Sequence, residues 1–533
     1  MPRMPTAAPP FQPTDLPGVL RQAMALHSQG NVDAARTLYR RILSVVPNHF
    51  DATHLLGVTY AQTGDQDKAL ELFSKALSIK PGHPEALFNR GTMYQQQHAH
   101  DDAIADFTCV IDEVPGHQGA LNNRSVCLEG AGRLEEALAD SDSLVALDPE
   151  NAVFWNNRGK LLGAMMDFEA ALTCLNKAVA LKPDYAEAFN NRAGVLAEFH
   201  RFDEALADYH NALAIRPDFA DVKLGKGQLL VQQGNYSEGW PLFECRWQQA
   251  GRQQAAAAFD TPPWLGNDDL AGKTILVHAE QGLGDTIQFC RYVPLLAERG
   301  ARVIVRAQPP VIDLLSSLDG VAHLLRPGDK APEWDFHCPM MSLPLAFGTM
   351  LDTVPDHGPY LSAEPDLVTH WADRLGSGTK PRVAIAWRGN PENSYDRRRR
   401  INLCDFVRLL DGNMEWISLH HELTDDEASL IEATPQLTRP LDENTDMTDA
   451  AAICAIVDVV ISIDTSLAHI AGATGRPTIV MLPFQPDFRW PVNRAETPWY
   501  ANLTLLHQRA DRDWAPVVRA AVAAAAKVVE SAG

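Results

Sequence analysis

The sequence lacks the features that mark several large classes of protein. Its eight cysteines stand singly, with no CxxC pair and no zinc-like spacing, which argues against a disulfide framework and favours reduced thiols. No uninterrupted apolar run approaches the roughly 20 residues that cross a bilayer, and prolines stand near the start, where a signal peptide needs an apolar helix. We therefore expect a cytoplasmic protein without an integral membrane segment.

Positive charge is also scarce. The 533 residues include 46 lysines and arginines against 68 aspartates and glutamates, a net charge of −22. Nucleic-acid binding needs a basic surface to neutralise phosphates, so this balance argues against a general nucleic-acid partner. The chain has no P-loop lysine and no GxGxxG motif, which leaves a nucleotide triphosphatase or a simple dehydrogenase unsupported. A chain of this length is expected to form two or more domains.

The first half of the chain contains an internal repeat of 34 residues. A small residue follows ten places after each repeated proline, and alanines keep the same phase. The repeated prolines are Pro47, Pro81, Pro115, Pro149, Pro183 and Pro217. This pattern resembles the tetratricopeptide repeat, whose paired helices approach closely at the small residues and end before the proline. We expect an all-α solenoid over residues 16–247, with six full repeats and a partial cap, after a disordered segment at 1–15.

One polar position recurs in register with the repeats. Asn89, Asn123, Asn157 and Asn191 are spaced 34 residues apart. Side-chain amides both donate and accept hydrogen bonds, so such a row could hold the backbone of an extended acceptor peptide. The O-GlcNAc transferases carry a similar asparagine ladder. The alternative is that asparagine is simply common at this repeat position.

The second half alternates β-branched apolar runs with helical segments, which predicts parallel sheets covered by helices. The runs at 274–280, 301–307, 382–389, 414–421, 457–464 and 477–483 are expected to be strands. A further short strand is expected before WDFHCPMMSLP. After a linker at 248–270, we expect two Rossmann-like lobes at 271–365 and 379–533, the second ending in a terminal helix. Two such lobes in series describe the GT-B fold of glycosyltransferases, although flavodoxin-like and dehydrogenase domains share the pattern.

Three groups of residues, each just after a predicted strand, are the candidate site. The first is a glycine-bearing turn at a helix start, where an anion can approach backbone N–H groups, with helix capping as the other explanation for its aspartate. It comprises Gln281, Gly282, Gly284 and Asp285.

The second group is an arginine-rich loop whose guanidinium groups could clamp a diphosphate, with a solvated basic loop as its alternative. It comprises Arg388, Asn390, Arg397 and Arg399. The third begins a helix of small residues, where hydroxyls and N–H groups could cradle phosphate, with a buried structural histidine as the alternative. It comprises Asp464, Thr465, Ser466 and His469.

The GLGD motif and the stretch ISIDTSLAHIAGATGRPTIVMLP resemble paired motifs of bacterial heptosyltransferase-type glycosyltransferases (family 9). In particular, the chain resembles bacterial proteins that fuse such a domain to tetratricopeptide repeats, a layout similar to that of O-GlcNAc transferase. The resemblance implies that Asp285 is the general base and that Asp464, Thr465, Ser466 and His469 contact the diphosphate and ribose of the donor. The remaining residues of the three groups are expected to bind the donor because of their own chemistry. The chain departs from the family at Arg388, where relatives often have serine, and at Glu392-Asn393-Ser394.

These observations predict an enzyme that transfers a sugar from a nucleotide-sugar donor, with inversion and without a metal or other cofactor. The expected acceptor is a serine or threonine of a protein held in the repeat groove, and the fused relatives suggest flagellin. Two alternatives remain open. The acceptor could be a saccharide or a lipid-linked glycan with the repeats as a docking module, or the chain could be a non-catalytic scaffold.

Overall fold

The computed structural model describes residues 15–249, 251–252, 259–355, 358–390, 395–410, 412–442 and 445–532. The chain divides into two compact units, residues 1–195 and 196–533. Most of the predicted N-terminal segment 1–15 and part of the predicted linker 248–270 lie outside the described residues.

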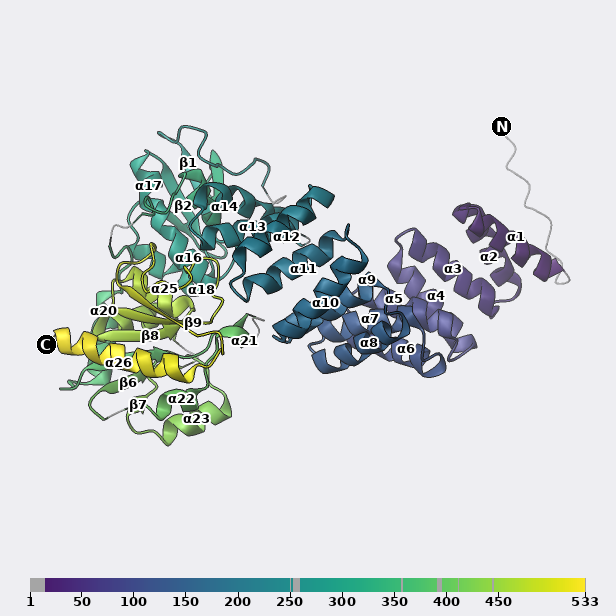
Figure 1. Cartoon of the computed structure of the whole chain (residues 1–533). Helices are drawn as coiled ribbons and strands as arrows, with labels where there is room; N and C mark the ends of the chain where they lie inside the picture. Colours follow the sequence, from purple (N-terminus) through teal and green to yellow (C-terminus); the bar gives the residue numbers. More distant parts are fainter. Residues whose placement is uncertain are drawn as a thin grey trace. The chain divides into compact units, whose positions relative to one another are not determined.

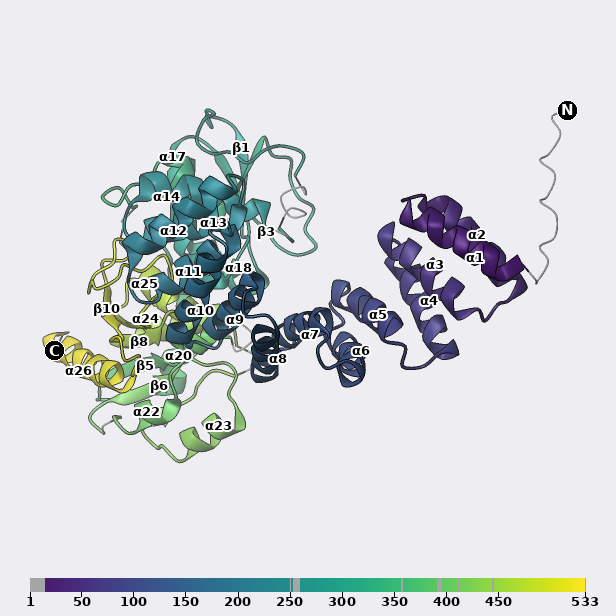
Figure 2. The same ribbon diagram turned by 45° about the vertical axis from the view of Figure 1, so that its right-hand side comes forward.

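The first unit is built of antiparallel helix pairs. From α1 to α10 each helix contacts the next along the chain, and the pairs are visible from α1 to α8 in Figure 2. The helices are α1 (Leu16–Ser28), α2 (Val32–Val45), α3 (Phe50–Gln62), α4 (Gln66–Ile79), α5 (Pro84–Gln96), α6 (His100–Glu113), α7 (Gln118–Gly130), α8 (Leu134–Leu147), α9 (Ala152–Ala164), α10 (Phe168–Leu181) and α11 (Ala186–Ala197). The second helix of each pair ends two residues before a repeated proline, because proline cannot continue the hydrogen-bond ladder.

The small residues of the repeat allow the paired helices to touch. A Cβ atom added at Gly57 would lie 2.8 Å from the ring of Phe73, and one added at Gly91 would lie 2.9 Å from the ring of Phe107. The repeated alanines Ala35, Ala69, Ala103, Ala137, Ala171 and Ala205 are fully buried. The interior of the repeats therefore depends on small residues packed under aromatic rings.

The second unit begins within α11 and continues with α12 (Phe202–Ile215), α13 (Ala220–Gln232), α14 (Tyr236–Phe243) and the 3₁₀ turn η2 (Glu244–Gln248). A four-stranded parallel sheet follows, in the order β3-β2-β1-β4. Its strands are β1 (Thr274–His278), β2 (Arg302–Arg306), β3 (Val321–Leu325) and β4 (Phe336–Pro339). The helical elements around it are α16 (Leu283–Phe289), η3 (Cys290–Tyr292), α17 (Val293–Glu298), α18 (Pro309–Ile312), η4 (Leu314–Ser317), η5 (Met340–Ser342) and α19 (Leu343–Ala346).

A second parallel sheet has six strands in the order β10-β9-β8-β5-β6-β7. Its strands are β5 (Arg382–Ala386), β6 (Glu415–Ser418), β7 (Leu437–Thr438), β8 (Val459–Ile463), β9 (Thr478–Leu482) and β10 (Leu503–His507). The surrounding helices are α20 (Pro365–Leu375), α21 (Asp396–Arg399), α22 (Leu403–Val407), α23 (Asp425–Glu432), α24 (Met447–Ile456), α25 (Ser466–Ala473) and α26 (Ala515–Ala532). Figure 1 shows the terminal helix α26 lying along β8 and β9, which it contacts.

The observed fold is an all-α repeat region followed by a region with two parallel sheets. The six strands predicted by range are present, and β3 precedes WDFHCPMMSLP, where a further short strand was expected. Strands β4, β7 and β10 were not predicted individually because they are short or lie at a sheet edge. Within the described ranges, no helix is both long and apolar enough to cross a membrane. The finer boundaries between repeat cap, linker and lobes stay predictions.

Candidate functional site

In each sheet there is one point at which the chain stops adding strands on one side and adds the next strand on the other side. In the smaller sheet the chain adds β2 and β3 on one side of β1 and then β4 on the other, and in the larger sheet β6 and β7 lie on one side of β5 and β8 on the other. The loops after the strands diverge at such a switch point and leave a crevice at the carboxyl ends, where open parallel sheets bind ligands. The loops after β1, β5 and β8 carry the three predicted groups.

One cavity of about 480 Å³ joins these loops. Its volume lies within the range of small-molecule sites in proteins. The predicted residues that line it are Gln281, Gly282, Gly284, Asp285, Asn390, Arg399, Asp464, Thr465, Ser466 and His469. The structure therefore brings members of all three groups together around one space.

The start of α25 supplies uncapped donors to this cavity. Thr465 is the N-cap residue but makes no side-chain cap hydrogen bond, and the first turn contains no acidic residue. Within the described residues, the N–H groups of Ser466 and Leu467 have no hydrogen-bond partner. Free N–H groups at the positive end of a helix favour an anion.

His469 lies one turn into α25 and is fully buried. Its Nδ1 lies 2.9 Å from the Tyr500 hydroxyl, and its ring stacks on Trp490 with the ring centroids 5.4 Å apart. Burial, reinforced by nearby arginines, holds the pKa of His469 well below its usual range, so the ring is neutral. A Cβ atom at Gly284 would lie only 2.8 Å from the His469 ring, so the glycine permits α16 to meet α25.

Arg489 joins two carboxylates at the cavity. Its guanidinium pairs with Asp285 and lies 3.3 Å from Oδ1 of Asp487. Asp285 also accepts a hydrogen bond of 2.9 Å from the Gly282 N–H, and so fixes the start of α16. Both the helix-capping role and the cavity position considered for Asp285 are therefore present.

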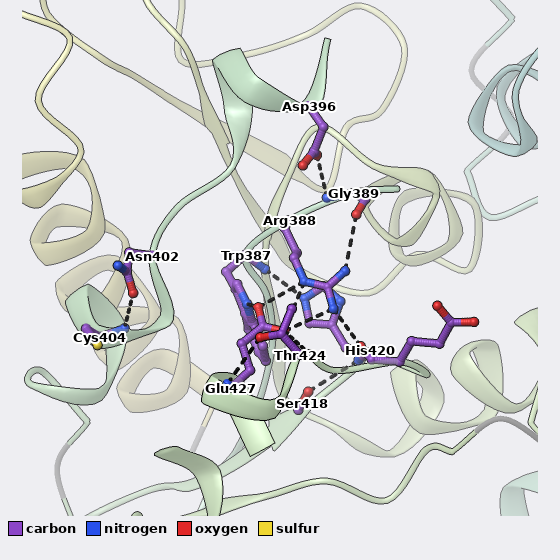
Figure 3. A network of polar contacts seen from close by, with 11 residues as sticks. Trp387, Arg388, Gly389, Asp396, Asn402, Cys404, Ser418, His420, Thr424 and Glu427 are labelled. Atoms are coloured by element: carbon purple, nitrogen blue, oxygen red, sulfur yellow. Dashed lines mark hydrogen bonds and ion pairs between the residues drawn. The ribbon is translucent and has the colours of Figure 1, made fainter. Parts of the chain in front are cut away.

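The predicted arginine clamp does not form as a unit. Arg388 does not line the cavity: its guanidinium donates to both carboxylate oxygens of Glu427, which also accepts from the Trp387 indole (Figure 3). Arg397 is exposed and lies outside the cavity lining. Consecutive residues of the short helix α21 point in different directions, which leaves Arg399 as the arginine of this run that reaches the cavity. The spacer Glu392-Asn393-Ser394 lies outside the described residues.

The repeated asparagines lie on the first helices of their repeats and are half-buried. The Asn157 amide donates to Asn122 at 3.0 Å, and the Asn191 amide donates to Asn156 at 2.9 Å. The Asn89 amide lies 2.9 Å from a ring nitrogen of His54 in the preceding repeat, and Asn123 lies 3.4 Å from the amide of Asn122. These amides therefore form a repeat-to-repeat ladder, and their binding to an acceptor stays a prediction.

Several cavity residues were missed by the sequence reasoning. Tyr395, Asp487, Phe488 and Arg489 line the cavity, together with Gln228 from helix α13. The segment after β9 carried a usable signal, because it leaves the carboxyl end of a predicted strand next to β8. Gln228 carried none, since it lies among repeat residues that were assigned to partner binding alone.

A second, smaller cavity of about 200 Å³ adjoins the first. The two share Gln228, Tyr395, Asp487 and Phe488. The smaller cavity is also lined by Glu198 and Gln232 from the repeat helices and by Arg398. The loop from Phe484 to Phe488 thus separates a space beside the sheets from a space beside the repeats.

Comparison with known families accounts for the helical part. Tetratricopeptide repeat models match residues 20–84, 85–152, 156–209 and 196–239. The helices in these ranges are tetratricopeptide repeats. The matches agree with the predicted repeat array and do not extend over the sheets.

Among curated proteins, the chain is similar to protein FlbA of Caulobacter vibrioides, with 24% identity over 330 residues. The match covers 56% of this chain and 53% of FlbA, so the chain spans about half the length of this relative.

Among solved structures, the chain is similar to a tetratricopeptide repeat protein from Parabacteroides merdae (16% identity, TM-score 0.40, 46% of this chain and 97% of the other). It is also similar to a thermophilic repeat protein of Thermus thermophilus (27% identity, TM-score 0.29, 34% and 100%) and to YrrB, described as a repeat protein with an unusual peptide-binding site (17% identity, TM-score 0.32, 35% and 97%).

Proposed function

We propose that the chain is a GT-B glycosyltransferase that moves a sugar from a nucleotide-sugar donor to a serine or threonine hydroxyl of a protein. The observation that carries this proposal is the cavity of about 480 Å³ at the switch points of two parallel sheets, with the uncapped start of α25 facing it. A donor of this class has a phosphate group between a base and a sugar, which suits a cavity with N–H donors between two lobes.

The proposed phosphate site uses the N–H groups of Ser466 and Leu467 and the guanidinium of Arg399. Arg399 donates to the backbone carbonyl oxygen of Asp464 and lies 3.5 Å from the Asp396 carboxylate, so a carbonyl and a carboxylate fix its position before a ligand binds. Donors held in place stabilise the charge that develops on a leaving phosphate without reorganising at that moment. We propose that Asp464 and Thr465 shape this site from the loop after β8.

The repeats supply the argument for a protein acceptor. Helix α13 contributes Gln228 and Gln232 to the smaller cavity, which lies beside the repeats, and tetratricopeptide arrays present extended surfaces to partner chains. We propose that an acceptor segment lies along the repeats, with the ladder of Asn89, Asn123 and their equivalents among its contacts. The family resemblance makes flagellin the first protein to test.

Ser466 offers a sharp test of the donor site, because it is the first residue of α25 and lines the cavity. Ser466→Glu places a negative charge there, which favours the helix but repels a phosphate. Glutamine has nearly the shape of glutamate without its charge, so Ser466→Gln is the matched control. Each protein is screened by thermal shift against UDP-, ADP-, GDP- and CMP-linked sugars.

We expect one nucleotide class to raise the melting temperature of the wild type, since a ligand that binds the native state stabilises it. The Gln variant should keep part of this shift and the Glu variant should lose it. Equal shifts in the two variants would remove α25 from the phosphate site. The absence of a shift in the wild type would favour a scaffold without catalysis, and turnover of saccharides in place of proteins would favour the docking alternative.

A further inference from the structure

The two carboxylates at Arg489 are held very differently. Asp285 has both oxygens engaged, because Oδ2 accepts from the Gly282 N–H and Oδ1 pairs with Arg489. Asp487 uses only Oδ1, at 3.3 Å from both the backbone nitrogen and Nη1 of Arg489. In the part of the chain that the structure describes, Oδ2 of Asp487 accepts no hydrogen bond. The Asp487 side chain is also more exposed, at 25% against 12% for Asp285.

Asp487 stands where the two cavities meet, since it lines both of them, whereas Asp285 lines only the larger. A donor in the larger cavity and an acceptor segment in the smaller would therefore face each other across Asp487. The geometry favours Asp487 over Asp285 for contact with a hydroxyl that enters from the repeat side.

The loop that carries Asp487 is fixed by the repeat helices. The Gln232 amide donates to the Pro486 carbonyl oxygen at 2.9 Å, and the Gln485 amide donates back to Gln232 at 2.9 Å. His200 lies 2.8 Å from the Phe484 carbonyl oxygen, and the Trp490 N–H donates to the Asp487 carbonyl oxygen at 3.0 Å. These bonds place the Asp487 carboxylate without occupying Oδ2, which is the pre-organisation that a proton acceptor requires.

We propose that Asp487, in place of Asp285, accepts the proton of the acceptor hydroxyl, with Asp285 acting as a positioning residue. This inference rests on the proposed glycosyl transfer. The acceptor oxygen forms a bond to the anomeric carbon of the sugar as its proton passes to Oδ2 of Asp487. The bond from that carbon to the phosphate oxygen breaks, and its electron pair leaves with the nucleotide. Asp487 then releases the proton to solvent.

The electrostatic surroundings suit this role. Burial raises the pKa of Asp487 to about 6, the Arg489 guanidinium opposes that rise, and the charges of Asp464 and Asp285 add to it. The other charged or titratable groups that line the two cavities are Glu198, Tyr209, Tyr395, Arg398, Arg399 and His469. A base with a pKa near the working pH transfers protons efficiently.

The experiment measures hydrolysis of the nucleotide sugar that the screen identifies, with water as the acceptor, in the full chain. Asp487→Asn should lower the rate by about 100- to 10,000-fold, the usual contribution of a general base, and keep the thermal shift with nucleotide. Asp487→Ala should recover part of the rate with added formate, a small carboxylate that can occupy the vacated space. The wild-type rate should fall as the pH drops through about 6, and Asp487→Asn should remove this acid limb.

Asp285→Asn and Asp352→Asn complete the design. Asp352 is exposed and outside both cavities, so its variant should hydrolyse at the wild-type rate. Asp285→Asn should lower the hydrolysis rate less than Asp487→Asn does, and its pH profile should keep the acid limb. Added formate should not restore the rate of Asp285→Ala. A wild-type rate and pH profile in Asp487→Asn, or formate rescue at Asp285 alone, would overturn the inference. Failure of the wild type to bind or hydrolyse any nucleotide sugar would overturn the proposed function itself.

Discussion

The contact between Gly284 and His469 gives the most direct prediction about the candidate site. In Gly284→Ala, the new methyl group would lie 2.8 Å from Cδ2 and 3.4 Å from Nε2 of the His469 ring. That ring has little freedom to move, because Tyr500 holds its Nδ1 and Trp490 stacks on its face. The substitution therefore has to push α16 away from α25.

The expected cost is that of overpacking a buried contact, about 1–3 kcal/mol. The higher helix propensity of alanine offsets part of this cost, since alanine stabilises a helix by about 1 kcal/mol relative to glycine. Because residues of α16 and α25 both line the cavity, their separation should also weaken the proposed nucleotide binding. We expect a lower melting temperature and a smaller ligand-induced shift.

Gly194→Ala is the control, because Gly194 is also helical and a Cβ there meets nothing within 4 Å. This variant should be as stable as the wild type or slightly more so. The Gly284→Ala change is also measured in the His469→Ala background, where the clash is gone and its cost should largely vanish. An equal cost in both backgrounds, or unchanged stability in Gly284→Ala, would refute this account of the helix contact.

Two further predictions concern polar contacts away from the cavity. Glu427→Gln should destabilise the second unit by about 1–3 kcal/mol at neutral pH, because the charged hydrogen bonds to Arg388 are lost. Burial alone would raise the pKa of Glu427, but its hydrogen bonds lower it to about 2. The wild type should therefore lose this stability as the pH falls from about 4.5 towards 2, and equal acid slopes in urea titrations of both proteins would contradict the assignment. Asn156→Ala should lower the stability of the first unit by about 1–2 kcal/mol, since Asn156 is buried and accepts a hydrogen bond from Asn191. The control is Asn190→Ala, at the equivalent position of the next repeat, which should cost less stability. Equal urea midpoints for the two variants would contradict the ladder.

The repeats were predictable because their signals are local and periodic. A proline at a fixed phase ends each second helix, and glycines such as Gly57 and Gly91 lie under aromatic rings of the partner helix. The central strands β1, β5, β8 and β9 were equally predictable from the sequence, since buried parallel strands are continuous apolar runs.

The site was predictable only where the residues follow a strand directly. Asp464 to Ser466 and Gln281 to Asp285 reach the cavity because parallel strands end at one edge of the sheet. Arg388 follows β5 just as closely, yet its side chain turns to Glu427, a long-range partner that no local pattern identifies. Asp487 and Gln228 depend on contacts between segments more than 250 residues apart, such as Gln232 with Pro486, which spacing cannot reveal.

The hydrogen bonds from Gln232 and His200 to the loop at 484–487 have a practical consequence for dissecting the chain. The last repeat helices supply part of the cavity wall, so a fragment that starts at the predicted linker would lack Gln228 and the supports of Asp487. A C-terminal fragment cut there would fail for structural reasons that say nothing about the chemistry of the cavity. A cut near residue 195, where the compact units divide, would instead remove the earlier repeats and leave the cavity whole.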